Sequence, residues 1–148
     1  MTAMRFESHP VSVVDIKEVE KRFGIQLPKP LKEFYLQSNG GRPDRDRYKG
    51  DGDIYIVNAF LPIKYAAGTG GTLERSIQWL KVDRRVLPDD LVPFAVDPFG
   101  NYFCFSISEV GAGAIYFVGM ECKGIPNGIL LCSSFDEFLA NLKRKGEA

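Results

Sequence analysis

The sequence predicts an α+β fold: one domain with a mostly antiparallel sheet of about five or six strands, flanked by about four helices. With 148 residues, 45% of them hydrophobic, the chain is long enough for one ordinary domain with a substantial core. Helical spacing of apolar residues marks both halves, whereas β-branched and aromatic runs separated by short turns favour antiparallel pairing. We expect a single domain over residues 1–148, with its core at 12–142 and short flexible termini.

The first two helices are indicated by their caps and by apolar stripes. Ser12 suits an N-cap, and Gly24 suits a left-handed C-terminal cap. Pro30 suits the first turn of the second helix, because that turn does not need the N–H that proline lacks. Apolar or small residues recur every three or four positions: Val13, Ile16, Val19 and Phe23 in the first helix, and Leu31, Phe34, Tyr35 and Ser38 in the second.

The motif Asn39-Gly40-Gly41 is predicted to end the second helix. We expect at least one of the two glycines to have a positive φ, because the chain must turn sharply into Arg42. Residues 42–53 then predict a charged surface loop, and residues 53–60 predict a strand because they are rich in β-branched and aromatic side chains.

A third helix is predicted to begin after Thr72, which follows a flexible glycine-rich loop at residues 66–71. Its apolar residues should face inward and its polar residues outward: Leu73, Ile77 and Leu80 against Glu74, Arg75, Gln78 and Lys81.

The second half of the chain predicts strands and a closing helix. Residues 91–96 and 101–107 predict a hairpin around the turn at 97–100, and further strands are predicted at 114–118 and 129–132. Asp97 should accept a local backbone hydrogen bond in the turn. Ser134 and Glu137 fit a capping box. The side chains expected to enter the core are Phe94, Val96 and Phe103 from the hairpin, and Phe135, Phe138, Leu139 and Leu142 from the helix.

Composition limits the partners that we expect. Nineteen Lys and Arg residues balance nineteen Asp and Glu, which argues against binding nucleic acid through phosphate neutralisation. The one basic run, at residues 143–145, is interpreted as a solvated tail. No apolar run is long enough for a membrane span or a signal peptide, and the odd count of three cysteines suits a reducing compartment. We therefore expect a cytoplasmic protein, a monomer or weak dimer, with three free thiols and no membrane contact.

The sequence does not predict an enzyme, a cofactor or a metal site. The single histidine, His9, lies in a segment flanked by proline, and no nucleophile-elbow, zinc-protease or P-loop motif is present. Residues 68–72 resemble an anion-binding loop only in their glycines, since the P-loop lysine is missing. Acids at 44, 46, 51 and 53 alternate with basic residues that would repel calcium, and the distal glutamate of a calcium loop is absent.

Three stretches carry a family resemblance. Residues 16–41 (IKEVEKRFGIQLPKPLKEFYLQSNGG) resemble the opening motif of the SUKH superfamily, the Smi/Knr-like proteins. Residues 94–101 (FAVDPFGN) are similar to its strand, turn and Gly-Asn hairpin, and residues 134–139 (SFDEFL) to its last helix. The positions shared with the family are interpreted as structural: Leu27, Pro28, Phe34, Asn39, Gly40, Gly41, Asp97, Gly100, Asn101 and Phe138.

The resemblance implies a non-catalytic protein-binding domain. Bacterial members are mostly immunity proteins that bind and neutralise polymorphic secreted toxins, often nucleases, while fungal relatives regulate cell-wall synthesis as interaction modules. An immunity protein that binds a toxin domain is therefore our leading hypothesis. The alternatives are a regulatory module of the Smi/Knr type and a small-molecule-binding protein that uses residues 68–72.

The partner-binding face is predicted in the charged stretch after the second helix. Arg and Tyr are enriched at interface hot spots, and mixed charges discriminate one partner from another. The candidate partner-binding residues are Asp44, Arg45, Asp46, Arg47 and Tyr48. For a nuclease partner an acidic face would also be expected, to which Asp89, Asp90 and Glu109 would contribute.

Overall fold

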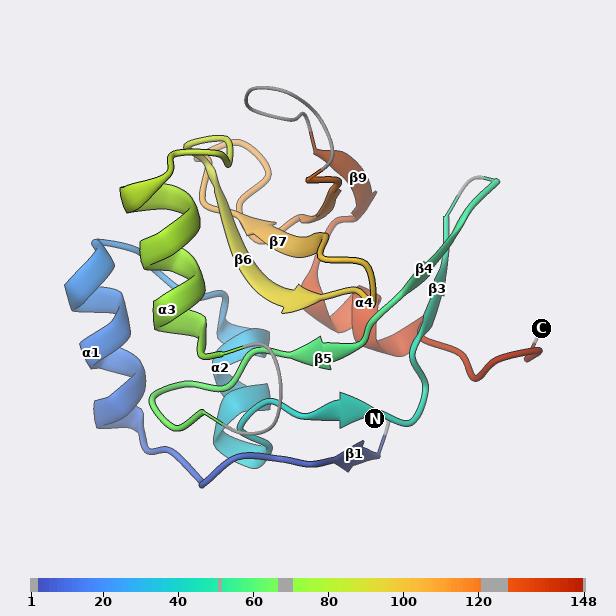
Figure 1. Ribbon diagram of the computed structural model, residues 1–148, viewed down its shortest axis with the longest axis horizontal. Coiled ribbons are helices and arrows are strands. Elements are labelled where there is room, and N and C mark those ends of the chain that lie inside the picture. The colour runs from blue at the N-terminus through green and yellow to red at the C-terminus, as the bar shows by residue number, and fades with distance from the viewer. Residues whose placement is uncertain (1–2, 51, 67–70, 121–127, 148) are drawn as a thin grey trace.

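A five-stranded antiparallel sheet forms the centre of the computed structural model, which describes residues 3–50, 52–66, 71–120 and 128–147 (Figure 1). The strands follow one another in chain order: β5 (Ala59–Phe60), β6 (Leu91–Val96), β7 (Tyr102–Ser106), β8 (Ile115–Val118) and β9 (Ile129–Cys132). Every neighbouring pair is antiparallel, which confirms the predicted α+β class.

Helices surround this sheet at the predicted positions. They are α1 (Val13–Phe23), α2 (Lys29–Gln37), α3 (Leu73–Ile77) with a π-helical continuation η1 (Gln78–Asp83), and α4 (Phe135–Ala140). The side chains of Ser12, Thr72 and Ser134 each accept a backbone N–H at the start of a helix, as predicted. One member of the α1 stripe differs from the prediction, since Val13 is 51% exposed at the first turn while Ile16 and Val19 are buried.

Side-chain alternation along the strands divides the core between the two faces of the sheet. On one face, Phe94, Phe103 and Phe105 are fully buried and join the main core with α2 and α4. On the other face, Cys104 and Val118 pack in a second cluster that includes Leu80 of η1. The predicted inward positions of Phe94 and Phe103 are confirmed, and Val96 packs against the main core while partly exposed.

Asn39 ties together three segments that are distant in sequence. Its Nδ2 donates to the carbonyl oxygens of His9 at 2.8 Å and Ile63 at 2.9 Å, and its Oδ1 accepts from the Ile63 amide at 2.7 Å. The next two residues have φ of +76° at Gly40 and +106° at Gly41, which confirms the predicted left-handed turn. A Cβ at Gly40 would lie 2.8 Å from the Phe60 carbonyl oxygen, so close backbone contact also requires glycine there.

Asp97 organises the β6–β7 turn as predicted. Its Oδ1 accepts from the amides of Phe99 and Asn101, each at 2.8 Å, and its Oδ2 accepts from the Asn101 side chain at 2.9 Å. Asn101 in turn accepts from the Met120 amide at 2.9 Å, which fixes the chain after β8 to the same turn.

The single strand predicted at residues 53–60 is wrong, because this stretch serves two different sheets. β4 (Ile54–Ile56) pairs with β3 (Arg47–Lys49), whereas β5 pairs with β6. The change of partner occurs at two consecutive amides: Val57 donates to the Asp46 carbonyl and Asn58 to the Val96 carbonyl, each at 2.8 Å.

The charged loop predicted at residues 42–53 and the expected flexible N-terminal segment are also corrected. β2 (Arg42–Pro43) pairs with β1 (Met4–Arg5), and β3 forms a hairpin with β4 that stands away from the central sheet (Figure 1). The amide of Ser8 donates to the Asn39 carbonyl at 3.0 Å. These strands could not be predicted from the sequence, since two or three residues are too few to show a period.

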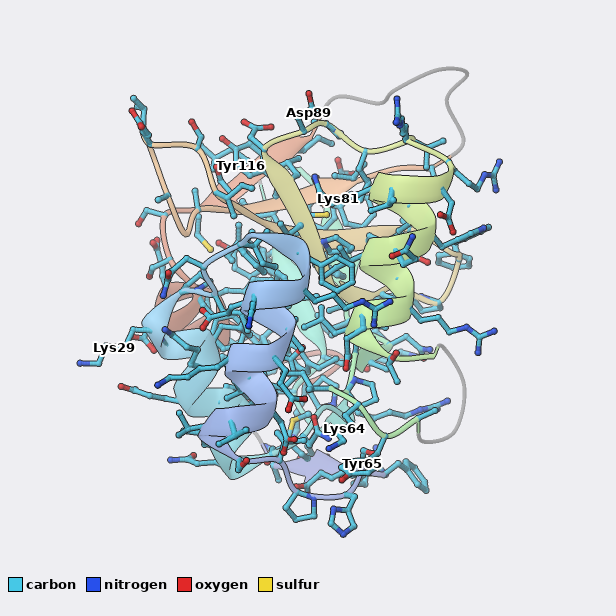
Figure 2. All side chains as sticks on the ribbon, turned by 90° about the vertical axis from the view of Figure 1, so that its left-hand side faces the viewer. Lys29, Lys64, Tyr65, Lys81, Asp89 and Tyr116 are labelled. Atoms are coloured by element: carbon cyan, nitrogen blue, oxygen red, sulfur yellow. The ribbon has the colours of Figure 1, made fainter. Side chains whose placement is uncertain are left out.

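The outward position predicted for Lys81 is wrong. Its Nζ donates to the carbonyl oxygens of Pro88, Asp89 and Leu91 at 3.1, 2.9 and 2.7 Å, and Figure 2 shows the side chain directed toward the strand that follows Asp89. Burial lowers the pKa of this ammonium group. The prediction assumed α-helical spacing, whereas the π-helical turns of η1 rotate the later side chains around the axis.

Two of the three cysteines are described, and both are free thiols: Cys104 and Cys132 are buried, while Cys122 lies outside the described residues. Within the described ranges, no helix has the length and apolar character needed to cross a bilayer.

Candidate protein-binding surface

Five consecutive residues were predicted to bind a partner, and the structure places them at the junction of β2 and β3: Asp44, Arg45, Asp46, Arg47 and Tyr48. The backbone of this junction is held on both sides. The Asp44 amide donates to the Ala3 carbonyl at 2.7 Å, and the Arg47 amide donates to the Lys143 carbonyl at 2.8 Å. The segment is therefore an ordered part of the domain rather than a free loop.

Tyr48 faces the core. Its ring stacks on Phe138 with centroids 5.3 Å apart, and its hydroxyl donates to the Leu131 carbonyl at 3.0 Å. Burial raises the pKa of Tyr48 to about 12, with the neighbouring Cys132 thiol as the second cause. Tyr55, the cross-strand partner of Tyr48, has its ring centroid 4.8 Å from that of Phe117 in β8. These two tyrosines on the inner face of the hairpin therefore pack the hairpin against the rest of the protein.

The outer face of the hairpin joins the C-terminal segment. Side chains alternate along a strand, so Arg47 and Lys49 lie on the face opposite to Tyr48, and Ile54 lies beside Lys49 in the paired strand. Arg47 and Lys143 exchange two backbone hydrogen bonds of 2.8 and 2.7 Å. The basic run at 143–145, interpreted as a solvated tail, is thus anchored against β3, and a groove of about 440 Å³ lies between them.

Three carboxylates hold the three arginines of this surface. Asp44 accepts from both Nε and Nη2 of Arg144 at 3.1 and 3.0 Å. The other two pairs are looser: the Arg47 Nε lies 3.4 Å from Asp46, and the Arg45 Nε lies 4.0 Å from Glu147. The Arg144 amide, followed by nearby Arg45, holds the pKa of Glu147 below its usual value.

Lysines supply the remaining charge. Within the described residues, no ion pair involves Lys49, Lys143 or Lys145. Arg45, Lys49 and Lys145 are exposed, whereas Arg47 and Lys143 are half-buried. The surface therefore combines arginines fixed by ion pairs with ammonium groups that remain available to a partner.

Trp79 is a candidate residue that the sequence analysis missed. The side chain lies on η1, is 48% exposed, and carries the Arg84 guanidinium 5.0 Å from its ring centroid. Beside it lies a second groove, of about 620 Å³, that reaches Tyr102. The only tryptophan of the chain, next to several arginines on an outward helical face, is the sequence feature that would have indicated this surface.

The acids considered for a nuclease partner share one end of the central sheet. Asp89 and Asp90 precede β6, and the Ile107 amide donates to the Asp90 carbonyl at 2.8 Å, which brings the chain before Glu109 to the same end. All three side chains are exposed.

The described residues contain no group of three or more His, Cys, Asp or Glu side chains placed to hold a metal ion. Asp44 and Asp46 each contact an arginine instead. Of the stretch 68–72 considered for a small molecule, only Gly71 and Thr72 are described; the Thr72 hydroxyl accepts from the Arg75 amide, so it is used as a helix cap.

Several positions shared with the SUKH motif have structural contacts. Leu27 is buried, and its amide donates to the Glu20 carboxylate at 2.8 Å, which joins the end of α1 to the start of α2. The ring centroids of Phe34 and Phe60 are 4.9 Å apart. These contacts support a structural role for both positions.

Comparison with known proteins gives one family. The model of the SMI1 / KNR4 family (SUKH-1) matches residues 10–141, a range that contains every helix and strand described above except β1. No curated protein sequence matches the chain.

Proposed function

The chain belongs to the SMI1 / KNR4 family (SUKH-1), and from this premise we propose that it is a non-catalytic protein-binding domain that acts as an immunity protein. In this role it binds a secreted toxin domain in the cytoplasm and blocks it. Family membership over residues 10–141 is the observation that carries the proposal. Binding alone is sufficient for neutralisation, so the domain needs a specific surface rather than catalytic residues.

The surface at the hairpin supports this role. Arg47 is the first residue of β3, and Arg45 lies in the short link between β2 and β3. Backbone hydrogen bonds fix this stretch to the N-terminal segment at Ala3 and to the C-terminal segment at Lys143. Preorganised side chains lose less conformational entropy on binding than mobile ones do. Tyr48 contributes indirectly, because its buried ring sets the position of its neighbours.

Toxin neutralisation sets a quantitative demand on this surface. Nanomolar affinity corresponds to about 12 kcal/mol of binding free energy. A few central side chains that lose at least about 2 kcal/mol on truncation usually dominate such an interface. Arg45 and Arg47 are the candidates at the hairpin, and Trp79 is the candidate on η1.

The test first searches the neighbouring genes for one that encodes a secreted toxin domain, and then uses that domain. We expect co-expression with the intact protein to restore growth of cells that carry the toxin domain, and calorimetry to give a nanomolar dissociation constant. The double substitution of Arg45 and Arg47 by alanine should weaken binding at least tenfold, whereas Lys17→Ala on α1 should not. Absence of both protection and binding would refute the immunity role.

The same set of variants locates the binding face. If Trp79→Ala abolishes protection while the double arginine variant protects like the parent, the face lies on η1 and not on the hairpin.

A regulatory module of the Smi/Knr type is the second candidate, because the matching family carries that name. It predicts binding to a cellular protein in strains that have no adjacent toxin gene.

A further inference from the structure

We propose that the groove between the outer face of the β3–β4 hairpin and the C-terminal segment binds an extended acidic segment of a protein partner. Carboxylates of that segment meet Lys49, Lys143 and Lys145, and an apolar side chain meets Ile54. The inference rests on the proposed protein-binding function and adds the chemistry of the partner. Sequence alone did not indicate it, because the two walls of the groove are about a hundred residues apart.

The charge of the groove differs sharply from that of the whole chain. The groove is lined by five basic residues, Arg47, Lys49, Lys143, Arg144 and Lys145, and by one acidic residue, Glu147. Ile54 and Gly146 complete the lining. The full chain carries nineteen basic and nineteen acidic residues and is neutral overall. Folding has therefore collected positive charge on one surface, which attracts a partner of opposite charge.

The arginines and the lysines have different roles in this groove. Arg144 donates two hydrogen bonds to Asp44, whereas Arg47 forms an ion pair of 3.4 Å with Asp46 although its buried Nε makes no hydrogen bond. A carboxylate therefore offsets part of the charge of each guanidinium group. Among the described residues Lys49, Lys143 and Lys145 form no ion pair, although the Glu147 carboxylate attracts Lys143 at longer range, and the three ammonium groups dominate the attraction. A partner carboxylate would thus replace water at a lysine and leave the three existing ion pairs intact.

Two features favour a polypeptide over a nucleic acid. Ile54 is 59% exposed in the wall of the groove, and an apolar contact of this kind is offered by a peptide side chain but not by a phosphate backbone. Among the described residues the groove has three lysines outside ion pairs, fewer than the roughly 6–10 phosphate contacts of a protein whose DNA affinity depends steeply on salt.

The test measures fluorescence anisotropy with a short fluorescein-labelled peptide in which glutamate alternates with valine. We expect binding at about 0.15 M ionic strength, where the Debye length is about 8 Å, and weaker binding as salt rises. Substitution of Lys49, Lys143 and Lys145 by glutamine should weaken binding about tenfold, because three charge pairs at or near the surface together contribute roughly that factor.

A matched control removes the same charge elsewhere. Lys17, Lys21 and Lys29 are exposed on α1 and α2, and Figure 2 shows Lys29 projecting from the molecule. Their triple glutamine variant has the same net charge as the groove variant and should bind the peptide like the parent. Ile54→Ser, which leaves every charge in place, should weaken binding of the glutamate–valine peptide but not of a glutamate–serine peptide.

Several results would overturn the inference. The groove variant, shown by circular dichroism to fold normally, could bind the peptide as tightly as the parent or no more weakly than the control variant does. A glutamine–valine peptide could bind as well as the glutamate–valine peptide. A single-stranded oligonucleotide of equal charge could bind more tightly than the peptide, which would assign the groove to phosphate.

Failure of this inference is distinguishable from failure of the proposed function. If the toxin domain binds the parent and the groove variant equally, the protein-binding function stands and the groove is not the contact. If the toxin domain binds neither but the acidic peptide still binds through the three lysines, the immunity role fails and the chemistry of the groove stands.

Discussion

Asn39 and Ile63 form a reciprocal pair in which the side-chain amide of one residue satisfies both backbone groups of the other. The amide Nδ2 donates to the Ile63 carbonyl at 2.9 Å, and Oδ1 accepts from the Ile63 N–H at 2.7 Å. Ile63 is fully buried and Asn39 is 2% exposed, so water cannot replace either bond. The asparagine of the Asn-Gly-Gly motif thus acts in place of a strand partner.

Loss of this side chain should destabilise the domain. Asn39→Ala leaves the buried N–H of Ile63 unsatisfied, whereas the Ile63 carbonyl still accepts from the Tyr65 amide at 2.7 Å. One unsatisfied buried group costs about 1–3 kcal/mol, so we expect the free energy of unfolding, measured by urea denaturation, to fall by about that amount. The control is Asn141→Ala, since Asn141 is exposed and bonds only within its own helix end. A loss no larger than that of the control would contradict the assigned role.

A pair of glycine substitutions separates backbone strain from steric contact. Gly40→Ala places a Cβ at φ +76° and 2.8 Å from the Phe60 carbonyl oxygen, whereas Gly24→Ala has φ +63° and no atom within 4 Å. Both lose about 1–2 kcal/mol to left-handed strain, and only Gly40→Ala adds the clash. We therefore expect the Gly40→Ala variant to have a clearly lower melting temperature than the Gly24→Ala variant. Equal melting temperatures would show that the backbone relaxes around the new methyl group.

Phe103 should be among the largest single contributors to stability. It is fully buried, with ring centroids 5.3 Å from Phe117 and 5.5 Å from Phe138. Phe103→Ala should lower the free energy of unfolding by about 3–5 kcal/mol, because it opens a cavity between the sheet and α4. Phe99→Ala is the control, since Phe99 is 77% exposed in the β6–β7 turn. An unchanged unfolding midpoint for Phe103→Ala would show that the core repacks.

Deprotonation of Tyr48 at alkaline pH should lower the stability of the folded protein, because its phenol is buried under the hairpin. Its pKa is raised from 10.0 to about 12 in the folded protein, so folding favours the protonated phenol. This contribution is fully present below pH 10 and is lost as pH rises toward 12, at about 1.4 kcal/mol for each pH unit. Stability curves of the parent and of Tyr48→Phe should therefore converge over this interval. Parallel curves would contradict the assignment.

The thiols offer a chemical test of burial. Burial raises the pKa of both Cys104 and Cys132, and the thiolate is the reactive form. In native protein at about pH 8 we expect both to react slowly with a disulfide reagent, since the ordinary cysteine pKa is near 8.5. The Cys122→Ser variant should therefore show no fast phase. Unfolded parent protein, never treated with a reductant, should show three thiols, and a smaller number would indicate a disulfide.

Much of the fold could be predicted because its elements are long or have caps. Ser12, Thr72 and Ser134 cap three of the helices through hydrogen bonds to residues close in sequence, and Asp97 does the same for the β6–β7 turn. These features depend on neighbours in sequence. Capping and turn chemistry therefore carry enough information to place them without a tertiary model.

The candidate surface could be predicted only in part, since its parts come from separate segments. The charged stretch was visible, but the inward position of Tyr48 depends on Phe138, and the groove depends on the pairing of Arg47 with Lys143. The π-helical turns of η1 were likewise not predicted, and from them the Lys81 ammonium group reaches the Leu91 carbonyl. Short strands and π-helical turns have no sequence period of their own.

The contact between the hairpin and the C-terminal segment also affects the order in which the molecule is completed. The ion pair of Asp44 with Arg144 joins residues 100 positions apart, and the backbone bonds of Arg47 with Lys143 span nearly the same interval. During synthesis β3 therefore lacks this partner until the residues after Leu142 have left the ribosome. The basic groove exists only afterwards, so a protein that recognises it distinguishes chains that have passed this point of translation from those that have not.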